Sequence, residues 1–184
     1  MTILNDASLR GKAKTLAKEH GLSAQEIMQR YFFEHLLMRL ERTQYREHFV
    51  IKGGLLLSSM MGVAQRTTMD LDATIRALTV SEETVAAAMR DICSINLGDG
   101  ITFAFKRVEP IRKDDDYGGL RAHLTATFGR MRTPLKVDVT TGDVITPREI
   151  EYQFLTLFGE GLIHLMSYPL ETCIAEKFEA VVKR

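Results

Sequence analysis

The sequence has few of the features that mark exported, membrane-bound or disordered proteins. Its 184 residues include four prolines, two cysteines and no tryptophan. The two cysteines, Cys93 and Cys173, cannot build a disulfide framework, and their spacing does not match a zinc site. No apolar run approaches the length of about 18 residues that predicts a membrane span. The N-terminus lacks a basic-then-apolar leader, so we expect a cytoplasmic protein.

Net charge is also absent, because 24 basic and 24 acidic side chains cancel. As a total, this argues against a generic polyanion-binding protein. The charges are nevertheless segregated along the chain. Residues 1–52 carry nine basic and six acidic side chains, and residues 101–136 carry eight and four. Residues 53–100 and 137–184 are acidic overall, so basic and acidic segments alternate.

The sequence does contain the pattern of an α+β fold. Helical periodicity with capping residues predicts helices over residues 8–20, 24–40, 82–93 and 170–183. Alternation of apolar and polar residues predicts strands over residues 69–76, 101–109, 119–128, 134–140, 151–158 and 162–166. We therefore expect a mixed sheet of four to six strands packed against helices. In the second helix, Arg39 lies outside the apolar stripe.

Three aspartates are the first candidates for chemistry. Asp70 and Asp72 are two residues apart in a predicted strand, so both carboxylates are expected on one face. Two buried like charges are costly unless a cation neutralises them. Mg²⁺ suits this role, because it takes one or two carboxylates together with phosphate oxygens. Asp138, on another alternating strand, would add a third carboxylate to a two-metal site. The solvated face of an edge strand would also account for these residues.

Gly53 and Gly54 follow Lys52 at a predicted helix start. Without Cβ atoms, the backbone there can approach a phosphate closely, and the free N–H groups of a helix N-terminus favour an anion. A simple tight turn is the alternative explanation for two adjacent glycines.

Lys177 lies within the apolar stripe that we expect Leu170, Ile174 and Val181 to form on the last helix. A lysine at such a position must reach solvent or find an anionic partner. A nucleotide triphosphate would satisfy its ammonium group, and so would a structural carboxylate.

These residues occur in four ordered motifs. The motifs are Lys52-Gly53-Gly54, Arg66-Thr67-Thr68-Met69-Asp70-Leu71-Asp72, Lys136-Val137-Asp138, and Pro169-Leu170-Glu171 running into Ala175-Glu176-Lys177. The set resembles the AbiEii/AbiGii toxin family of the DNA polymerase β-like nucleotidyltransferase superfamily. The resemblance covers the chain from about residue 25 to its C-terminus.

The resemblance implies a nucleotidyltransferase fold and a role for each matching residue. Lys52, Gly53 and Gly54 match the positions that bind the nucleotide phosphates. Asp70, Asp72 and Asp138 match the catalytic carboxylates that hold Mg²⁺ or Mn²⁺. Asp138 would also help to activate the attacking hydroxyl group. Lys177 matches a catalytic lysine that contacts the nucleotide.

The resemblance further implies an enzyme that moves a nucleoside monophosphate from an NTP to a hydroxyl acceptor. It suggests the toxin of an abortive-infection toxin–antitoxin pair, with a cognate antitoxin as partner and tRNA as acceptor. The basic segments 1–52 and 101–136 are where we expect an RNA backbone to lie. The alternatives are transfer to a small molecule or a protein, and a non-catalytic nucleotide-binding module that pairs with an antitoxin.

The sequence departs from the family pattern in two places. The gap between Gly54 and Asp70 is slightly longer than is usual, which we treat as an insertion. Family members usually continue into a helical C-terminal lobe, which these 184 residues do not include. We expect residues 1–48 to form a helical segment packed on a catalytic core of residues 49–184.

Overall fold

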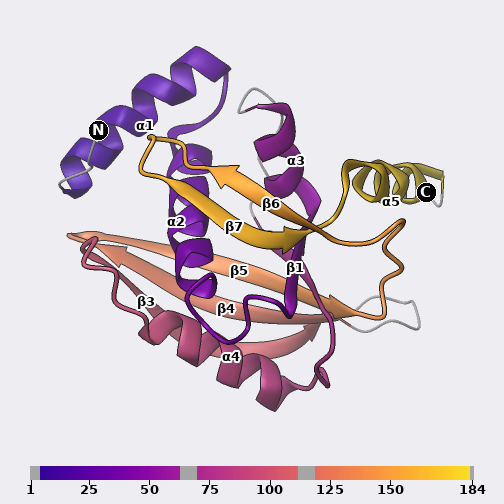
Figure 1. Ribbon diagram of the computed structural model, residues 1–184. Helices are drawn as coiled ribbons and strands as arrows, with labels where there is room; N and C mark the ends of the chain where they lie inside the picture. Colours follow the sequence, from indigo (N-terminus) through magenta and orange to yellow (C-terminus); the bar gives the residue numbers. More distant parts are fainter. Residues whose placement is uncertain (1–4, 63–69, 112–118, 183–184) are drawn as a thin grey trace.

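The computed structural model describes residues 5–62, 70–111 and 119–182, and within them five helices surround one seven-stranded sheet (Figure 1). The helices are α1 (Asp6–His20), α2 (Ala24–Leu40), α3 (Gly53–Met61), α4 (Glu82–Ser94) and α5 (Leu170–Val182). The strands are β1 (Phe49–Lys52), β2 (Leu71–Ile75), β3 (Ile101–Ile111), β4 (Gly119–Phe128), β5 (Met131–Thr141), β6 (Ile150–Leu155) and β7 (Leu162–Ser167). The predicted α+β class is confirmed. The strand count exceeds the expected range by one, because the short apolar run before Gly53 forms β1.

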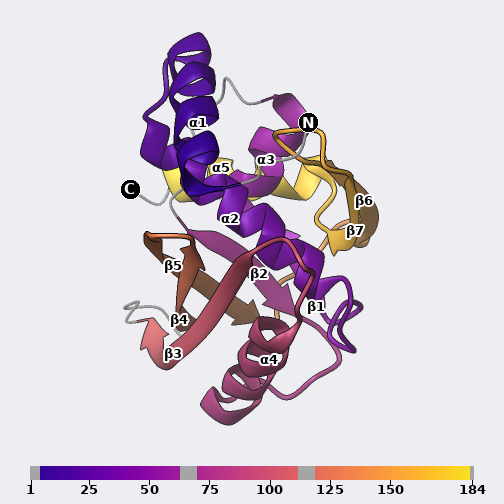
Figure 2. The same cartoon turned by 90° about the vertical axis from the view of Figure 1, so that its left-hand side faces the viewer.

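The sheet is mixed, with the strand order β3-β4-β5-β2-β1-β7-β6 (Figures 1 and 2). The pairs β2–β5 and β1–β7 are parallel, and the other four neighbouring pairs are antiparallel. Strand β1 thus lies inside the sheet, between β2 and β7, although it is the first strand in the chain. This topology brings β2, β4 and β5 together, which carry three of the charged groups described below.

Local sequence signals set the ends of the first two helices. The backbone of Gly21 has a φ of +67°, and its N–H donates to the carbonyl of Ala17 at the end of α1. Ser23 and Glu26 form the predicted capping box at the start of α2, each side chain accepting a backbone N–H of the other. Both predicted boundaries are confirmed.

One face of the sheet packs against α2 and α4. Side chains of Ile51, Ala73 and Val137, from three adjacent strands, meet Leu37 of α2 and Met89 of α4 around one small cavity. Adjacent residues of a strand point to opposite faces of the sheet. The residues that flank these apolar positions therefore lie on the other face.

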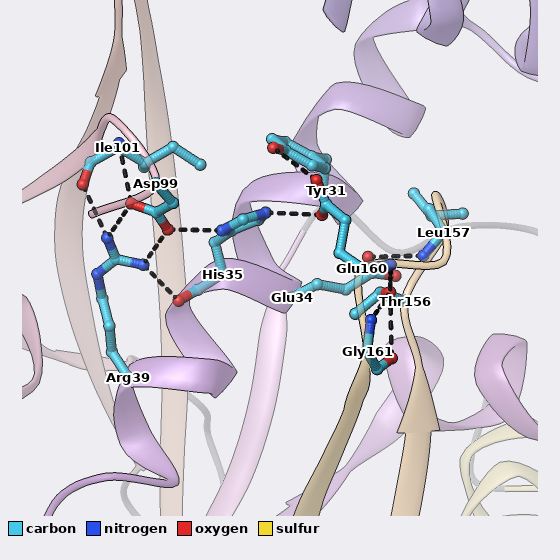
Figure 3. Close-up of polar contacts among 10 residues, drawn as sticks. All are labelled: Tyr31, Glu34, His35, Arg39, Asp99, Ile101, Thr156, Leu157, Glu160 and Gly161. Carbon is cyan, nitrogen blue, oxygen red and sulfur yellow. Dashed lines mark hydrogen bonds and ion pairs between the residues drawn. The ribbon is translucent and has the colours of Figure 1, made fainter. Parts of the chain in front are cut away.

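Helix α2 is buried on almost all sides, which its apolar periodicity did not predict. Arg39 has no exposed surface. Its two Nη atoms donate to the Asp99 carboxylate at 3.0 and 2.8 Å, and it also bonds the carbonyl of Ile101 (Figure 3). His35 lies between Asp99, at 2.7 Å from Nδ1, and Glu160, at 3.1 Å from Nε2. Arg39 lies outside the apolar stripe and is nevertheless buried, because the Asp99 carboxylate neutralises its charge.

The same helix holds the turn between β6 and β7. The Glu34 carboxylate accepts the backbone N–H of Leu157 at 2.9 Å and Nε–H of Arg30 at 3.1 Å. The Thr156 hydroxyl accepts the backbone N–H of Glu160 at 2.8 Å (Figure 3). Burial raises the pKa of Glu34 to about 7, although the nearby Arg30 opposes the shift. Helix α2 therefore anchors the turn through hydrogen bonds.

Helix α5 departs from its predicted packing. Leu170, Ile174 and Val181, expected as a packed apolar stripe, are 40%, 47% and 73% exposed. The helix instead buries Thr172 and Cys173 in its first turn. The Thr172 hydroxyl donates to a backbone carbonyl of the segment before β6 at 2.8 Å. The predicted stripe was therefore wrong, because α5 is attached through its first turn and lies beside α3 (Figure 1).

Three sequence features lie outside the described residues: positions 66–69 of the second motif, the acidic run 114–116, and residues 183–184. Among the helices that the structure does describe, none has the length and apolar character needed to cross a bilayer.

Candidate active site

A row of charged side chains crosses five neighbouring strands on the face of the sheet opposite α2 and α4. Each member pairs directly with the next in the strand register. Residues at directly paired positions share a face of the sheet. From β3 to β1, the row consists of Glu109, Arg121, Asp138, Asp72 and Lys52. Two cations thus enclose two adjacent carboxylates.

Asp72 and Asp138 form the centre of this row. They lie on parallel strands at directly paired positions. Burial, followed by the negative charges of Asp138 and Asp70, raises the pKa of Asp72 to about 6. The positive charges of Lys52 and Lys177 oppose this shift. The predicted residues are therefore electrostatically coupled, although they come from distant parts of the sequence.

Asp70 reaches the row from outside its strand. Strand β2 begins at Leu71, so the period-two alternation expected to align Asp70 with Asp72 does not apply to Asp70. Its carboxylate lies 3.6 Å from Nη2 of Arg121. The contact with Arg121, rather than the strand geometry, places Asp70 beside Asp138.

Arg121 is one of the site residues that sequence reasoning missed. Its Nε and Nη2 atoms each donate to one oxygen of Asp138, both at 2.7 Å. Hydrogen bonding to Asp138 raises the pKa of Arg121 further above its usual range. The alternation of residues 119–128 places Arg121 among the polar positions of β4. Only the register of β4 on β5 shows which carboxylate it meets.

Gly53 starts α3 and lies directly against Asp72. Its φ is +74°, and a Cβ atom at this position would lie 2.2 Å from Oδ2 of Asp72. Both facts require glycine here. The first-turn N–H groups of α3 have no partner within the helix, which favours an anion at this end. Gly54, the next residue, is buried.

Lys52 is held beside the row by a second group of residues. Its Nζ lies 2.6 Å from Oδ2 of Asp143 and 3.7 Å from Oε1 of Glu176. Asp143 also accepts the hydroxyls of Thr140 at 2.6 Å and Tyr168 at 2.9 Å. Burial alone would raise the pKa of Asp143, but these hydrogen bonds hold it below its usual range. Asp143 and Tyr168 were not foreseen, because their role depends on loop and strand packing.

Lys177 comes close to the site for a different reason from the one expected. It lies on an exposed part of α5, so the apolar surroundings inferred for it were wrong. Its charge nevertheless lowers the pKa of Asp72, which places it within electrostatic reach of that carboxylate.

The oxygen donors of the row suit a divalent cation such as Mg²⁺. Burial, together with the negative charges of Asp138 and Asp70, raises the pKa of Asp72, and a bound cation would neutralise those charges. Across residues 5–62, 70–111 and 119–182, no group of three or more His, Cys, Asp or Glu side chains is arranged to hold a metal ion. The guanidinium of Arg121 instead contacts both Asp70 and Asp138. The donor chemistry therefore fits, and Arg121 competes for two of the donors.

Two structures from Helicobacter pylori resemble this chain at 16% sequence identity. The structure of JHP933 matches with a TM-score of 0.50, over 85% of this chain and 57% of that chain. A second protein, to which a nucleotidyltransferase activity is attributed, matches with a TM-score of 0.49, over 85% of this chain and 59% of that chain. The chain thus spans less than two thirds of either protein, and the first likeness concerns the fold alone.

No curated protein matches the chain. The family model for the nucleotidyl transferase AbiEii toxin of type IV toxin–antitoxin systems matches residues 35–184, which include Gly53, Asp72, Asp138 and Lys177. The chain therefore belongs to the AbiEii nucleotidyl transferase toxin family.

Proposed function

We propose that the protein transfers a nucleoside monophosphate from an NTP to a hydroxyl group of an acceptor, with Mg²⁺ or Mn²⁺ as cofactor. The observation that carries this proposal is the paired position of Asp72 and Asp138 next to Gly53 at the start of α3. Such an arrangement offers carboxylates for a cation and backbone N–H groups for phosphate at one place.

In the proposed reaction, the acceptor oxygen forms a bond to the α-phosphorus of the NTP. The bond between the α-phosphorus and the oxygen that bridges to the β-phosphate breaks, and pyrophosphate leaves with its electron pair. The hydroxyl proton passes to the Asp138 carboxylate. A bound divalent cation supplies neutralisation of the phosphate charge.

Two lysines complete the proposed nucleotide site. Asp143 and Glu176 hold the ammonium group of Lys52 next to Gly53, where it would attract the phosphates. The exposed Lys177 is free to extend toward the same region, and it would neutralise charge that develops during the transfer.

For the acceptor we propose tRNA, and for the biological role a toxin with a cognate antitoxin. The family is that of type IV toxins. Along β5, Arg132 and Lys136 are exposed at positions that alternate onto the same face as Asp138. These two cations lead toward the site, as the path of a phosphate backbone would require.

The experiment is label transfer from each of the four α-³²P-labelled NTPs to total tRNA in the presence of Mg²⁺. We expect labelled tRNA with the wild type. Asp72→Asn should reduce the labelling rate about 100-fold or more, because it removes a charge used in the transition state. Asp91→Asn is the matched control, since Asp91 is exposed on α4 behind the sheet, and it should label tRNA at the wild-type rate. Equal labelling by Asp72→Asn would contradict the proposal.

The labelling assay, together with a measurement of NTP binding, separates the alternatives. Label in a protein or a small molecule instead of tRNA would show that the acceptor is wrong and the reaction right. NTP binding by calorimetry without transfer to any acceptor would indicate a non-catalytic nucleotide-binding module.

A further inference from the structure

We propose that Arg121 is an internal counter-cation, which occupies the place between Asp70 and Asp138 and must leave it before a divalent cation binds both carboxylates. The inference rests on the proposed function only in taking these carboxylates as cation ligands. It concerns how the carboxylates are neutralised when no metal is bound, and which group a metal displaces when it binds.

The geometry of the guanidinium supports this role. Arg121 is bonded to both oxygens of Asp138 at 2.7 Å, and its Nη2 also lies 3.6 Å from Asp70. A bidentate arginine directs its N–H groups at the same carboxylate lone pairs that a metal would use. One positive group therefore already serves the two acidic residues that a metal would bridge.

The burial of these groups makes the neutralisation important. The side chains of Asp138, Arg121 and Asp70 are 16%, 28% and 32% exposed. Partly buried carboxylates that face one another repel unless a cation lies between them. Asp72, at the position paired with Asp138, already has a raised pKa for this reason among others. Arg121 thus allows the row to fold in the absence of a metal.

The structure also provides a place for the released guanidinium. On the side of Arg121 away from Asp138, its paired residue on β3 is Glu109. Glu109, Pro110, Ile111 and Arg121 line a cavity of about 550 Å³. Glu109 at present lies 2.7 Å from Nε2 of His123 and accepts from Nε of Arg107 at 3.2 Å, so Arg121 would share this carboxylate with them. A rotation of the Arg121 side chain would exchange one carboxylate partner for another without a change in the backbone.

The test is the affinity of the nucleotide-free protein for Mn²⁺, measured by calorimetry and by the electron paramagnetic resonance signal of free Mn²⁺. Arg121→Gln removes the competing charge, so we expect its Kd for Mn²⁺ to be about tenfold lower than that of the wild type. Arg121→Lys keeps the positive charge but cannot bond both oxygens of Asp138 as the guanidinium does. Its Kd should therefore lie between those of the wild type and Arg121→Gln. The rise in Tm on addition of Mn²⁺ should be largest in Arg121→Gln, intermediate in Arg121→Lys and smallest in the wild type.

Arg46→Gln is the matched control, because it removes the same charge from an exposed ion pair with Glu151 far from the row. Its Kd for Mn²⁺ should equal that of the wild type. Arg121→Lys also keeps the test decisive if Arg121→Gln does not fold. Unchanged or weaker Mn²⁺ binding in the Arg121 variants would overturn the inference, as would the absence of Mn²⁺ binding in all proteins. Tighter binding in a protein that transfers no nucleotide would uphold the inference while the proposed function fails.

Discussion

At Gly53, the absence of one methyl group allows the Asp72 carboxylate to lie against the first turn of α3. A side chain here would meet two obstacles, the positive φ of +74° and the nearby carboxylate. The first costs about 1–3 kcal/mol for a residue other than glycine. The contact between a new Cβ atom and the carboxylate would displace Asp72, the residue at the centre of the proposed site.

Gly53→Ala should therefore destabilise the protein more than Gly21→Ala. Gly21 has a similar φ of +67°, and a Cβ atom there would meet no heavy atom within 4 Å. Gly21→Ala should lower the free energy of unfolding by about 1 kcal/mol, and Gly53→Ala by about 2 kcal/mol or more. Urea denaturation measures both. Equal losses in the two variants would show that Asp72 is not held against Gly53.

The residues of the site differ in how far the sequence reveals them. Gly53, Asp72 and Asp138 could be named beforehand, because they occur in an ordered set of motifs that resembles a known family. Taken singly, a glycine pair or a carboxylate on an alternating strand would also fit a tight turn or a solvated strand face. Arg121 and Asp143 could not. Their partners are set by the register of β4 on β5 and by the segment after β5, and neither is encoded in local periodicity.

At the scale of elements, α2 combines core packing with buried charge. Burial alone would lower the pKa of His35, but its hydrogen bonds to Asp99 and Glu160, and their charges, raise it above its usual range. Arg39 and Glu34 face the same cluster from the helix itself, and the Tyr31 ring packs against the imidazole in a tilted geometry, with the ring centroids 4.3 Å apart. His35 therefore links α2 to the segments before β3 and β7.

This arrangement predicts a pH-dependent contribution to stability. Since the pKa of His35 is raised on folding, its stabilisation is fully present below the pKa of an unfolded histidine and is lost as the pH rises through the folded pKa. His35→Gln should lower the free energy of unfolding by about 1–3 kcal/mol near pH 6 and by less near pH 9. Urea denaturation at both pH values tests this.

The control for His35→Gln is His48→Gln, which replaces a partly exposed histidine that bonds a backbone carbonyl. Burial raises the pKa of Glu34 to about 7 and the charge of His35 opposes this shift, so the difference between the two variants measures His35 together with its effect on Glu34. A loss in His35→Gln that is equal at the two pH values would mean that the charge of His35 does not stabilise the fold.

Elements were predictable where capping and periodicity agree. Helices α1, α2 and α4 begin and end close to the expected residues. The packing of two helices was not predictable. Arg39 breaks the apolar pattern of α2 yet has no exposed surface, whereas Phe178 fits an apolar pattern on α5 and is 69% exposed. Which face of a helix is buried depends on what the chain places against it.

For the whole molecule, the formal net charge of zero conceals an ordered arrangement. The topology brings acidic β2 together with β4 and β5, so that in the row from Glu109 to Lys52 a cation lies on each side of two adjacent carboxylates. Segregation along the sequence suggested separate basic and acidic regions. The fold instead pairs them, with Arg121 on Asp138 and Lys52 on Asp143.

The most direct measurement is a crystal structure with Mg²⁺ and an NTP analogue that cannot be cleaved between its α- and β-phosphates. We expect the cation on the carboxylates of Asp70, Asp72 and Asp138, the phosphates at Gly53 and Gly54, and the Arg121 side chain turned away from Asp138. A nucleotide bound elsewhere, or a cation that does not contact these carboxylates, would contradict the proposed active site.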